Sequence, residues 1–405
     1  MIKNKTLVFI HQNFPGQFLH LCRDLVKDNR VFFITKNTQN RIANVQLLTY
    51  QPHRATTPNI HPYLTTIEDG ILHGQAVGRI LLQMHNQGVR PDIIIGHSGW
   101  GETQFAKDIF PDVPLLTYFE FFYSAKGADV GFDPEFPSTD ELKFHLRSRN
   151  QLLLSCLEAT DQGISPTWWQ HSRFPKVFSS KIEVIHDGVD TTALVPADNP
   201  TVTLPNGLTF DGSVPLVTFV ARNLEPYRGF HIFMRAAERI LKRHPTAHIV
   251  VVGGDDVSYG KKLPDGETYR AHVLKQVSID EQRVHFVGRI EYDVFKKMLQ
   301  VSDAHVYLTY PFVLSWSMIE AMSTGCLVIG SQTSPVEEVI RHEQNGLLVD
   351  FFDPENIATT VVEAITKPER FKDIRKAARR TAIDRYDLYG VSLPRQKALL
   401  QTMMG

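Results

Sequence analysis

The stretch AHVYLTYPFVLSWSMIEAMSTGCLVIGS, residues 304–331, decides the fold of this chain. It begins with β-branched and aromatic residues typical of a buried strand, and it ends with a second apolar run, CLVIGS. The segment between them has a helical pattern, so the order predicts two parallel strands joined by a crossover helix. The helix also carries an acid, Glu320, among small and apolar neighbours. A carboxylate on a helix otherwise suited to burial indicates a function beyond packing.

The same alternation of strands and helices runs through the rest of the chain. Further apolar runs that predict buried strands cover residues 6–12, 30–35, 92–97, 114–120, 216–222, 247–254 and 283–289. Helical patterns lie between them, for example at residues 17–27 and 71–87. We therefore expect an α/β protein with two Rossmann-like domains, each built on a parallel sheet.

Periodicity fails at residues 186–215, which are rich in Pro, Gly, Asn and Asp and indicate a linker. We expect an N-terminal domain at 1–190, a C-terminal domain at 191–375 and a helical segment at 376–405. In open parallel sheets ligands bind beyond the carboxyl ends of the strands. Residues that follow strands are therefore the candidates for a site, which we expect in a cleft between the domains.

Composition excludes several classes of protein. The chain has 405 residues, 42% of them hydrophobic, and a formal net charge of -1, which argues against a dedicated nucleic-acid binder. Three cysteines lie far apart and form no disulfide or zinc framework. The N-terminal apolar run is too short for a signal peptide, and no stretch reaches the roughly 18 apolar residues of a membrane span. We expect a cytoplasmic protein with at most peripheral membrane association.

Two motifs carry a resemblance to a known family. Residues 304–331 and the stretch FVARNLEPYRGF at 219–230 resemble the donor-binding region of retaining glycosyltransferases of family 4 (group 1 glycosyltransferases). The resemblance covers nearly the whole chain and is strongest at residues 185–349. It implies the GT-B architecture, in which two Rossmann-like domains face each other across a deep cleft and a C-terminal helix crosses back to the N-terminal domain.

The resemblance also assigns roles in a donor site. Glu320 matches the second of two family glutamates, which accepts hydrogen bonds from the two ribose hydroxyls of a nucleotide sugar. The first glutamate falls on Phe312, which cannot accept a hydrogen bond. Either Phe312 packs against the sugar ring, or Ser315 and the loop backbone replace the lost contact. The donor-binding loop therefore comprises Phe312, Val313, Leu314 and Ser315.

Arg222, and Arg228 six residues later, match the family pattern for the diphosphate of the donor. Two cations can neutralise a pyrophosphate and the charge that develops on it during bond cleavage. The base would be held by the backbone around Arg289 and Ile290, which leaves uracil and guanine equally open. Because arginines serve the phosphates, we expect neither a metal nor a cofactor, and we interpret Asp255 and its neighbouring acid as part of a turn.

The first half supplies the remaining candidates. Gly16 partly matches a glycine loop at a helix N-terminus, which would let the backbone approach the donor phosphate. His97 ends a strand, and in the family a histidine here lies beside the transferred sugar. Gln17, Glu102 and Glu120 are acceptor-side candidates. Either acid can hold acceptor hydroxyls or form a partly buried pair.

Together these features predict a retaining glycosyltransferase that uses a UDP- or GDP-linked sugar, with His97, Arg222 and Arg228 as its catalytic residues. The acceptor would be a glycan, a lipid-linked acceptor or a small molecule in bacterial glycan or glycoconjugate synthesis. A non-catalytic nucleotide-sugar-binding scaffold is the alternative, motivated by Phe312. A dinucleotide-dependent oxidoreductase is disfavoured, because HQNFPGQF after the first strand lacks GxGxxG.

Overall fold

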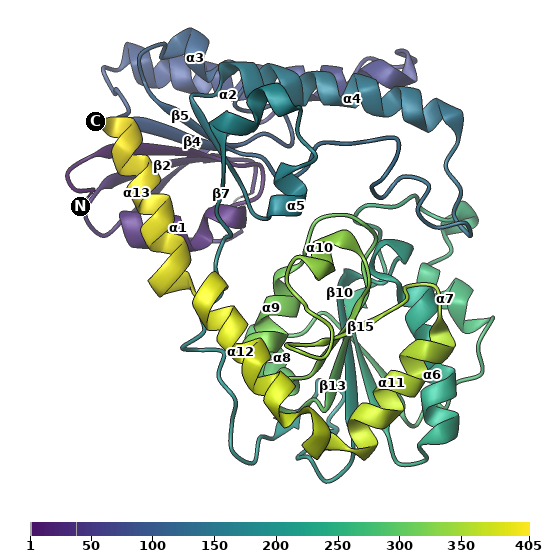
Figure 1. Cartoon of the computed structure of the whole chain (residues 1–405). Helices are drawn as coiled ribbons and strands as arrows, with labels where there is room; N and C mark the ends of the chain where they lie inside the picture. The colour runs from purple at the N-terminus through teal and green to yellow at the C-terminus, as the bar shows by residue number, and fades with distance from the viewer. Residues whose placement is uncertain (1, 38) are drawn as a thin grey trace. The chain divides into compact units, whose positions relative to one another are not determined.

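A computed structural model of the chain describes residues 2–37 and 39–405 and separates into two units (Figure 1). Unit 1 consists of Met1–Gly188 and Leu388–Gly405, and unit 2 consists of Val189–Asp387. The chain therefore passes between the units twice. The domain limits expected from the sequence lie two residues from the first crossing, whereas the expected C-terminal segment at 376–405 begins before the second.

The sheet of unit 1 has seven parallel strands in the order β3-β2-β1-β4-β5-β6-β7. Its strands are β1 (Thr6–Ile10), β2 (Arg30–Thr35), β3 (Val45–Thr49), β4 (Ile93–His97), β5 (Leu115–Tyr118), β6 (Gln162–Ser165) and β7 (Ile182–Val184). In the central register Val8 pairs with Phe32 on one side and with Ile94 on the other. Continuous apolar runs form these strands because helices cover both faces of the sheet.

Two helical layers cover this sheet (Figure 1). The helices of unit 1 are η1 (Gly16–Phe18), α1 (Leu19–Leu25), η2 (Pro62–Leu64), α2 (Thr65–Asn86), α3 (Ala106–Ile109), α4 (Asp140–Ala159), α5 (Trp168–His171), η3 (Lys176–Lys181), η7 (Leu388–Ser392) and α13 (Leu393–Met404). Leu393, Leu399 and Leu400 of α13 pack in one core with α1 and the sheet. The predicted return of the C-terminal helix to the N-terminal domain is thus confirmed.

The sheet of unit 2 has six parallel strands in the order β12-β11-β10-β13-β14-β15. Its strands are β10 (Leu216–Asn223), β11 (His248–Gly254), β12 (Val284–Gly288), β13 (Ala304–Tyr307), β14 (Val328–Ser331) and β15 (Leu347–Val349), and a separate antiparallel pair joins β8 (Val202–Thr203) to β9 (Thr209–Phe210). The opening stretch forms β13, α9 (Trp316–Ser323) and β14, with His305 paired to Val328. The predicted βαβ unit is confirmed.

Helices alternate with the strands of unit 2 along the sequence. They are η4 (Pro226–Arg228), α6 (Phe230–Arg243), η5 (Pro264–Gly266), α7 (Tyr269–Leu274), α8 (Tyr292–Val301), α10 (Ser334–Glu337), α11 (Pro354–Thr366), η6 (Pro368–Phe371) and α12 (Lys372–Tyr386). Arg379 ties α12 to α9 by donating to the carbonyl oxygens of Leu194 and Ser323.

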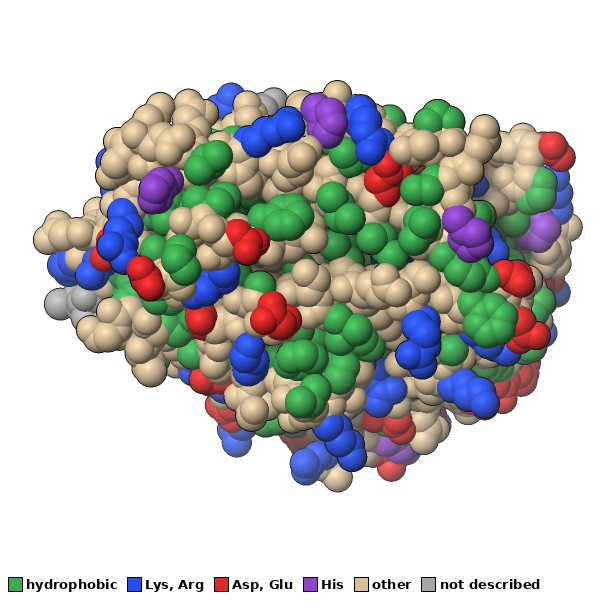
Figure 2. All heavy atoms as spheres, turned by 90° about the horizontal axis from the view of Figure 1, so that it is seen from above, with side chains coloured by type: hydrophobic (Ala, Val, Ile, Leu, Met, Phe, Trp, Pro, Cys, Tyr) green, Lys and Arg blue, Asp and Glu red, His purple; other side chains and the backbone are tan. Residues whose placement is uncertain are grey.

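Among the described residues, no helix is both long and apolar enough to cross a membrane. On the face drawn in Figure 2, basic and acidic side chains are interspersed.

Candidate functional site

Two histidines stand at the carboxyl ends of neighbouring strands in unit 1. His11 follows β1 and His97 ends β4, and each ring accepts a backbone N–H at Nδ1, from Asn13 (2.9 Å) and from Gly99 (2.9 Å) respectively. Burial lowers the pKa of His11 to about 4 and that of His97 well below its ordinary value. Both rings are therefore neutral near pH 7, and each carries its proton on Nε2.

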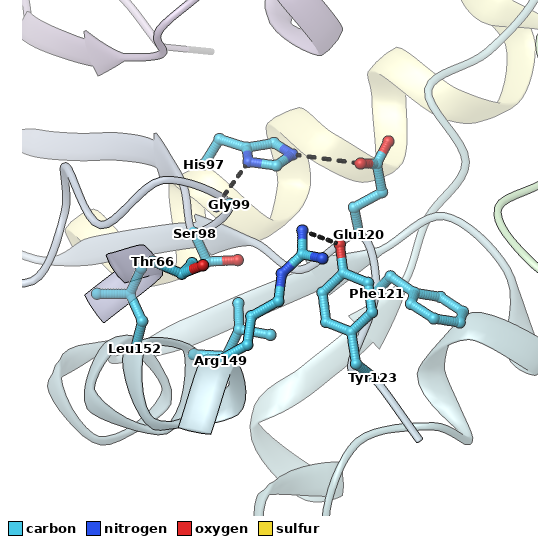
Figure 3. A pocket seen from close by; sticks show the side chains of 10 residues that line it. Thr66, His97, Ser98, Gly99, Glu120, Phe121, Tyr123, Arg149 and Leu152 are labelled. Carbon is cyan, nitrogen blue, oxygen red and sulfur yellow. Dashed lines mark hydrogen bonds and ion pairs between the residues drawn. The ribbon is translucent and has the colours of Figure 1, made fainter. Parts of the chain in front are cut away.

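A chain of hydrogen bonds starts at the first of these rings. His11 Nε2 donates to Gln17 Oε1 over 2.7 Å, and Gln17 Nε2 donates to Glu120 Oε1 over 3.0 Å. The other oxygen of Glu120 lies 4.0 Å from His97 Nε2 (Figure 3). The structure therefore brings together three predicted residues, Gln17, His97 and Glu120. His11 was not predicted, although its position at a strand end is the signal that singled out His97.

Gly16 is a glycine because of His11. Its φ of +54° favours glycine, and a Cβ on it would lie 2.4 Å from Nε2 of the His11 ring. Any side chain at this position would therefore displace the imidazole that begins the hydrogen-bond chain. Contact between Gly16 and a donor phosphate stays a prediction.

A polar pocket opens beside His97 in unit 1 (Figure 3). Its lining residues are Thr66, His97, Ser98, Gly99, Glu120, Phe121, Tyr123, Arg149, Leu152 and Leu153. Arg149, on α4, donates from Nη2 to the Tyr123 hydroxyl over 2.7 Å, and its guanidinium carbon lies 3.8 Å from the centre of that ring. The pocket combines a cation, a carboxylate and a neutral N–H donor, which suits a ligand with several hydroxyls. The sequence did not single out Arg149, because α4 carries many charged residues.

Glu102 is not among the residues that line this pocket. Its Oε1 accepts a 2.7 Å hydrogen bond from the Tyr50 hydroxyl, which also lies 3.1 Å from Nδ1 of His73. Burial raises the pKa of Glu102 to about 7, and among the described residues its Oε2 has no hydrogen-bond partner. These contacts agree with the alternative that Glu102 forms a buried pair. A role of Glu102 toward the acceptor stays a prediction.

The two arginines predicted to serve the diphosphate differ in their surroundings. Arg228 is buried in unit 2, where Nη1 donates to the Tyr307 hydroxyl (3.1 Å), to Thr309 Oγ1 (2.7 Å) and to the Val313 carbonyl (2.9 Å). It thereby fixes the loop after β13. Arg222 is exposed near the end of β10. The diphosphate roles of both stay predictions.

Phe312 lies in an aromatic cluster of unit 2. It is 4% exposed, and its ring centre lies 5.4 Å from that of Tyr227 and 4.9 Å from that of Tyr259. Ser315 caps α9, and its backbone N–H donates to the Tyr307 hydroxyl over 2.8 Å. Part of the polar backbone that we expected to replace the missing glutamate is therefore already bonded within unit 2. Packing of Phe312 against a sugar stays a prediction.

Glu320 lies on α9 beside the first turn of α8. Its Oε1 accepts a 2.9 Å hydrogen bond from the hydroxyl of Tyr292, a half-exposed residue that no motif in the sequence singles out. Burial raises the pKa of Glu320 to about 7, and the bond from Tyr292 opposes this shift. Arg289 is exposed, with Nη2 3.4 Å from Asn223 Oδ1, and Ile290 packs against the core of unit 2.

The glycine-rich turn after β11 is held by internal contacts. Asp256 lies 3.0 Å from Lys262 and accepts the N–H of Val257, while Asp255 pairs with Arg270. The buried carboxylate of Glu225 accepts backbone N–H groups from residues 258–260. Within residues 2–37 and 39–405, no group of three His, Cys, Asp or Glu side chains has the arrangement of a metal site.

Two family models match the sequence. The glycosyl transferase family 4 group matches residues 27–194, and glycosyl transferases group 1 matches residues 204–381. A D-inositol 3-phosphate glycosyltransferase of Rhodococcus jostii is 29% identical over 205 residues, which are 50% of this chain and 44% of that protein. D-inositol 3-phosphate glycosyltransferase 2 of Catenulispora acidiphila is 26% identical over 75% of this chain and 70% of its own. For most of the curated relatives that it matches, the chain spans about half of the relative's length.

Solved structures share the fold over the whole chain. Anabaena Alr3699/HepE in complex with UDP and glucose matches with a TM-score of 0.68 at 17% identity, covering 98% of this chain and 100% of that one. Sucrose-phosphate synthase from Thermosynechococcus elongatus matches with a TM-score of 0.73 at 14% identity, covering 98% and 99%. At these identities the likeness establishes the architecture and no more.

Proposed function

Because the chain belongs to the group 1 glycosyltransferases and has their GT-B fold, we propose that it transfers a sugar from a nucleoside-diphosphate sugar to an acceptor hydroxyl with retention of configuration. The observation that carries this proposal is the position of Glu320. It lies within the matched residues 204–381, on the helix after β13, and presents a partly buried carboxylate anchored by Tyr292. Such a carboxylate can accept hydrogen bonds from the two hydroxyls of a ribose.

The diphosphate would be served by Arg222 and Arg228. Arg228 is held by three acceptors, so its charge is preorganised and needs no rearrangement as the leaving group becomes more negative. Arg222 is exposed and can close on the phosphates from solvent. In this proposal no enzyme nucleophile is used: the acceptor attacks the face from which the diphosphate leaves, and a donor phosphate oxygen takes the acceptor proton.

The acceptor would be a hydroxylated molecule, whether a glycan, a lipid-linked acceptor or a small polyol. The polar pocket of unit 1 supports this class, since it offers His97, Glu120 and Arg149 to hydroxyl and anionic groups. The named relatives are inositol 3-phosphate glycosyltransferases, which makes polyol phosphates sensible first acceptors to test. We further propose that turnover needs no metal and that the reaction belongs to bacterial glycan or glycoconjugate synthesis in the cytoplasm.

The test is a screen of the full chain against UDP-, GDP- and ADP-linked sugars. Thermal shift identifies the nucleotide that stabilises the protein, and product formation with polyol phosphates identifies the reaction. NMR of the product's anomeric configuration decides between retention and inversion. Stabilisation by a nucleotide sugar with no transfer across the panel would favour the non-catalytic scaffold, which the phenylalanine at position 312 motivates.

A further inference from the structure

The hydrogen bonds that join His11, Gln17 and Glu120 have a fixed direction. Because Nδ1 of His11 accepts the Asn13 N–H, Nε2 must donate to the amide oxygen of Gln17. The amide nitrogen of Gln17 then faces Glu120 and donates to Oε1. If the Gln17 amide were turned over, its NH₂ group would face the N–H of His11, and its oxygen would face the carboxylate of Glu120. The imidazole of His11 therefore dictates the orientation of Gln17, and Gln17 in turn fixes Glu120.

A gap separates Glu120, the last residue of this hydrogen-bonded series, from His97. His97 Nε2 is buried, and among the described residues it has no hydrogen-bond partner. Glu120 Oε2 lies 4.0 Å away (Figure 3), which is longer than a hydrogen bond. An oxygen atom about 2.8 Å from each could span the gap. This oxygen would have to accept a hydrogen bond from the Nε2–H of neutral His97 and donate a hydrogen bond to the carboxylate of Glu120.

Only some ligand groups meet both conditions. A carboxylate or a fully deprotonated phosphate cannot donate, and the carboxylate of Glu120 would repel any anion. An ammonium group cannot accept the N–H of His97. A hydroxyl both accepts and donates, and it adds no charge beside two buried histidines.

We propose that His11 is a positioning residue which, through Gln17, holds Glu120 opposite His97, so that these two side chains bind one hydroxyl of a sugar or polyol substrate. This inference rests on the proposed sugar transfer, since it states how a hydroxylated substrate of that reaction is held. It also explains Gly16, whose missing side chain leaves room for the His11 ring.

The first experiment needs no activity. Nitrogen-15 spectra of the histidine rings in the full chain should show His11 and His97 protonated at Nε2 near pH 7. Gln17→Leu should shift the Nε2 signal of His11. The Nε2 signal of His73, a buried histidine of α2 that takes no part in these hydrogen bonds, should stay unchanged. Glycerol, the smallest polyol probe, should shift the His97 signal saturably, and Glu120→Ala should abolish this response. A proton on Nδ1 of His11, or a glycerol response that persists in Glu120→Ala, would overturn the proposal.

The second experiment uses whichever donor and acceptor the unmodified protein turns over. His11→Phe keeps an aromatic ring but loses the N–H donor, and it should lower kcat/KM for the hydroxylated substrate about tenfold, the loss of one hydrogen bond. His11→Gln, which keeps an N–H donor, should recover most of this loss. Gly16→Ala should resemble His11→Phe, whereas the control His73→Gln should retain the unmodified kcat/KM. If His11→Phe behaves like the control, the positioning role of His11 is refuted while sugar transfer stands. If no donor–acceptor pair is turned over, sugar transfer is refuted, and the nitrogen-15 spectra of the histidine rings still test the positioning role of His11.

Discussion

Glu320 is expected to cost stability and to bind nucleotide, and these two effects can be separated. A carboxyl group whose folded pKa of about 7 lies above its ordinary 4.5 binds more protons in the folded than in the unfolded state between those values. The free energy of unfolding therefore falls as pH rises through this window, and the loss is complete above pH 7. The pKa difference corresponds to about 3 kcal/mol, which partial exposure of the side chain reduces to about 1–2 kcal/mol.

The perturbation is Glu320→Gln. The amide still accepts the hydrogen bond from Tyr292 but never ionises, so at pH 8 the variant should be about 1–2 kcal/mol more stable than the unmodified chain, with little difference at pH 4. Urea unfolding at the two pH values measures this. Binding of the nucleoside diphosphate should instead weaken about tenfold at pH 8, because a neutral amide replaces a charged acceptor of the ribose hydroxyls. Isothermal calorimetry measures that affinity.

Glu102→Gln is the matched control. Burial also raises the pKa of Glu102 to about 7, so this variant should show a similar gain in stability at pH 8 without any change in nucleotide affinity. If Glu320→Gln gains stability but binds the nucleotide as tightly as the unmodified protein, Glu320 is a structural acid and the ribose role is refuted. If neither variant gains stability, burial does not raise the two pKa values as argued.

The remaining predictions concern the phosphates and the loop after β13. Arg222→Ala should lower turnover and leave the melting temperature unchanged, because Arg222 is exposed; Arg228→Ala should lower both, with a loss of about 2–4 kcal/mol in stability as three acceptors lose a buried donor. Equal melting temperatures for the two variants would contradict this assignment. Chelation with EDTA should leave turnover intact, and rescue of an EDTA-inactivated enzyme by added Mg²⁺ or Mn²⁺ would show the opposite. Phe312→Glu should impair the native donor and cost about 1–3 kcal/mol in stability, since the new acid would be buried among aromatic rings; transfer at or above the unmodified rate would place Phe312 away from the sugar.

Periodicity sufficed for the fold because parallel strands buried on both faces leave continuous apolar runs, as in IIIGH of β4 and HIVVVGG of β11. Strand-end placement singled out His97, whose role stays a prediction. The contact of Glu120 with Gln17 could not be predicted, because His11 and Gln17 follow β1 whereas Glu120 follows β5, and they meet only after the strands are ordered β1-β4-β5. Tyr292 and Arg149 were missed for a related reason: each lies on a helix, and nothing in the local pattern separates it from other surface residues.

The environment of Arg228 bears on the departure at position 312. One guanidinium nitrogen donates to Tyr307, Thr309 and the Val313 carbonyl, so the loop that carries Phe312 is fastened to the same residue that we assign to the diphosphate. Phe312 itself packs against the rings of Tyr227 and Tyr259. The loop is therefore held by aromatic packing and a charged donor to backbone oxygen. We expect the donor loop of this chain to be ordered before the donor binds, which reduces the entropy lost on binding and makes its shape, rather than a carboxylate, the determinant of the sugar.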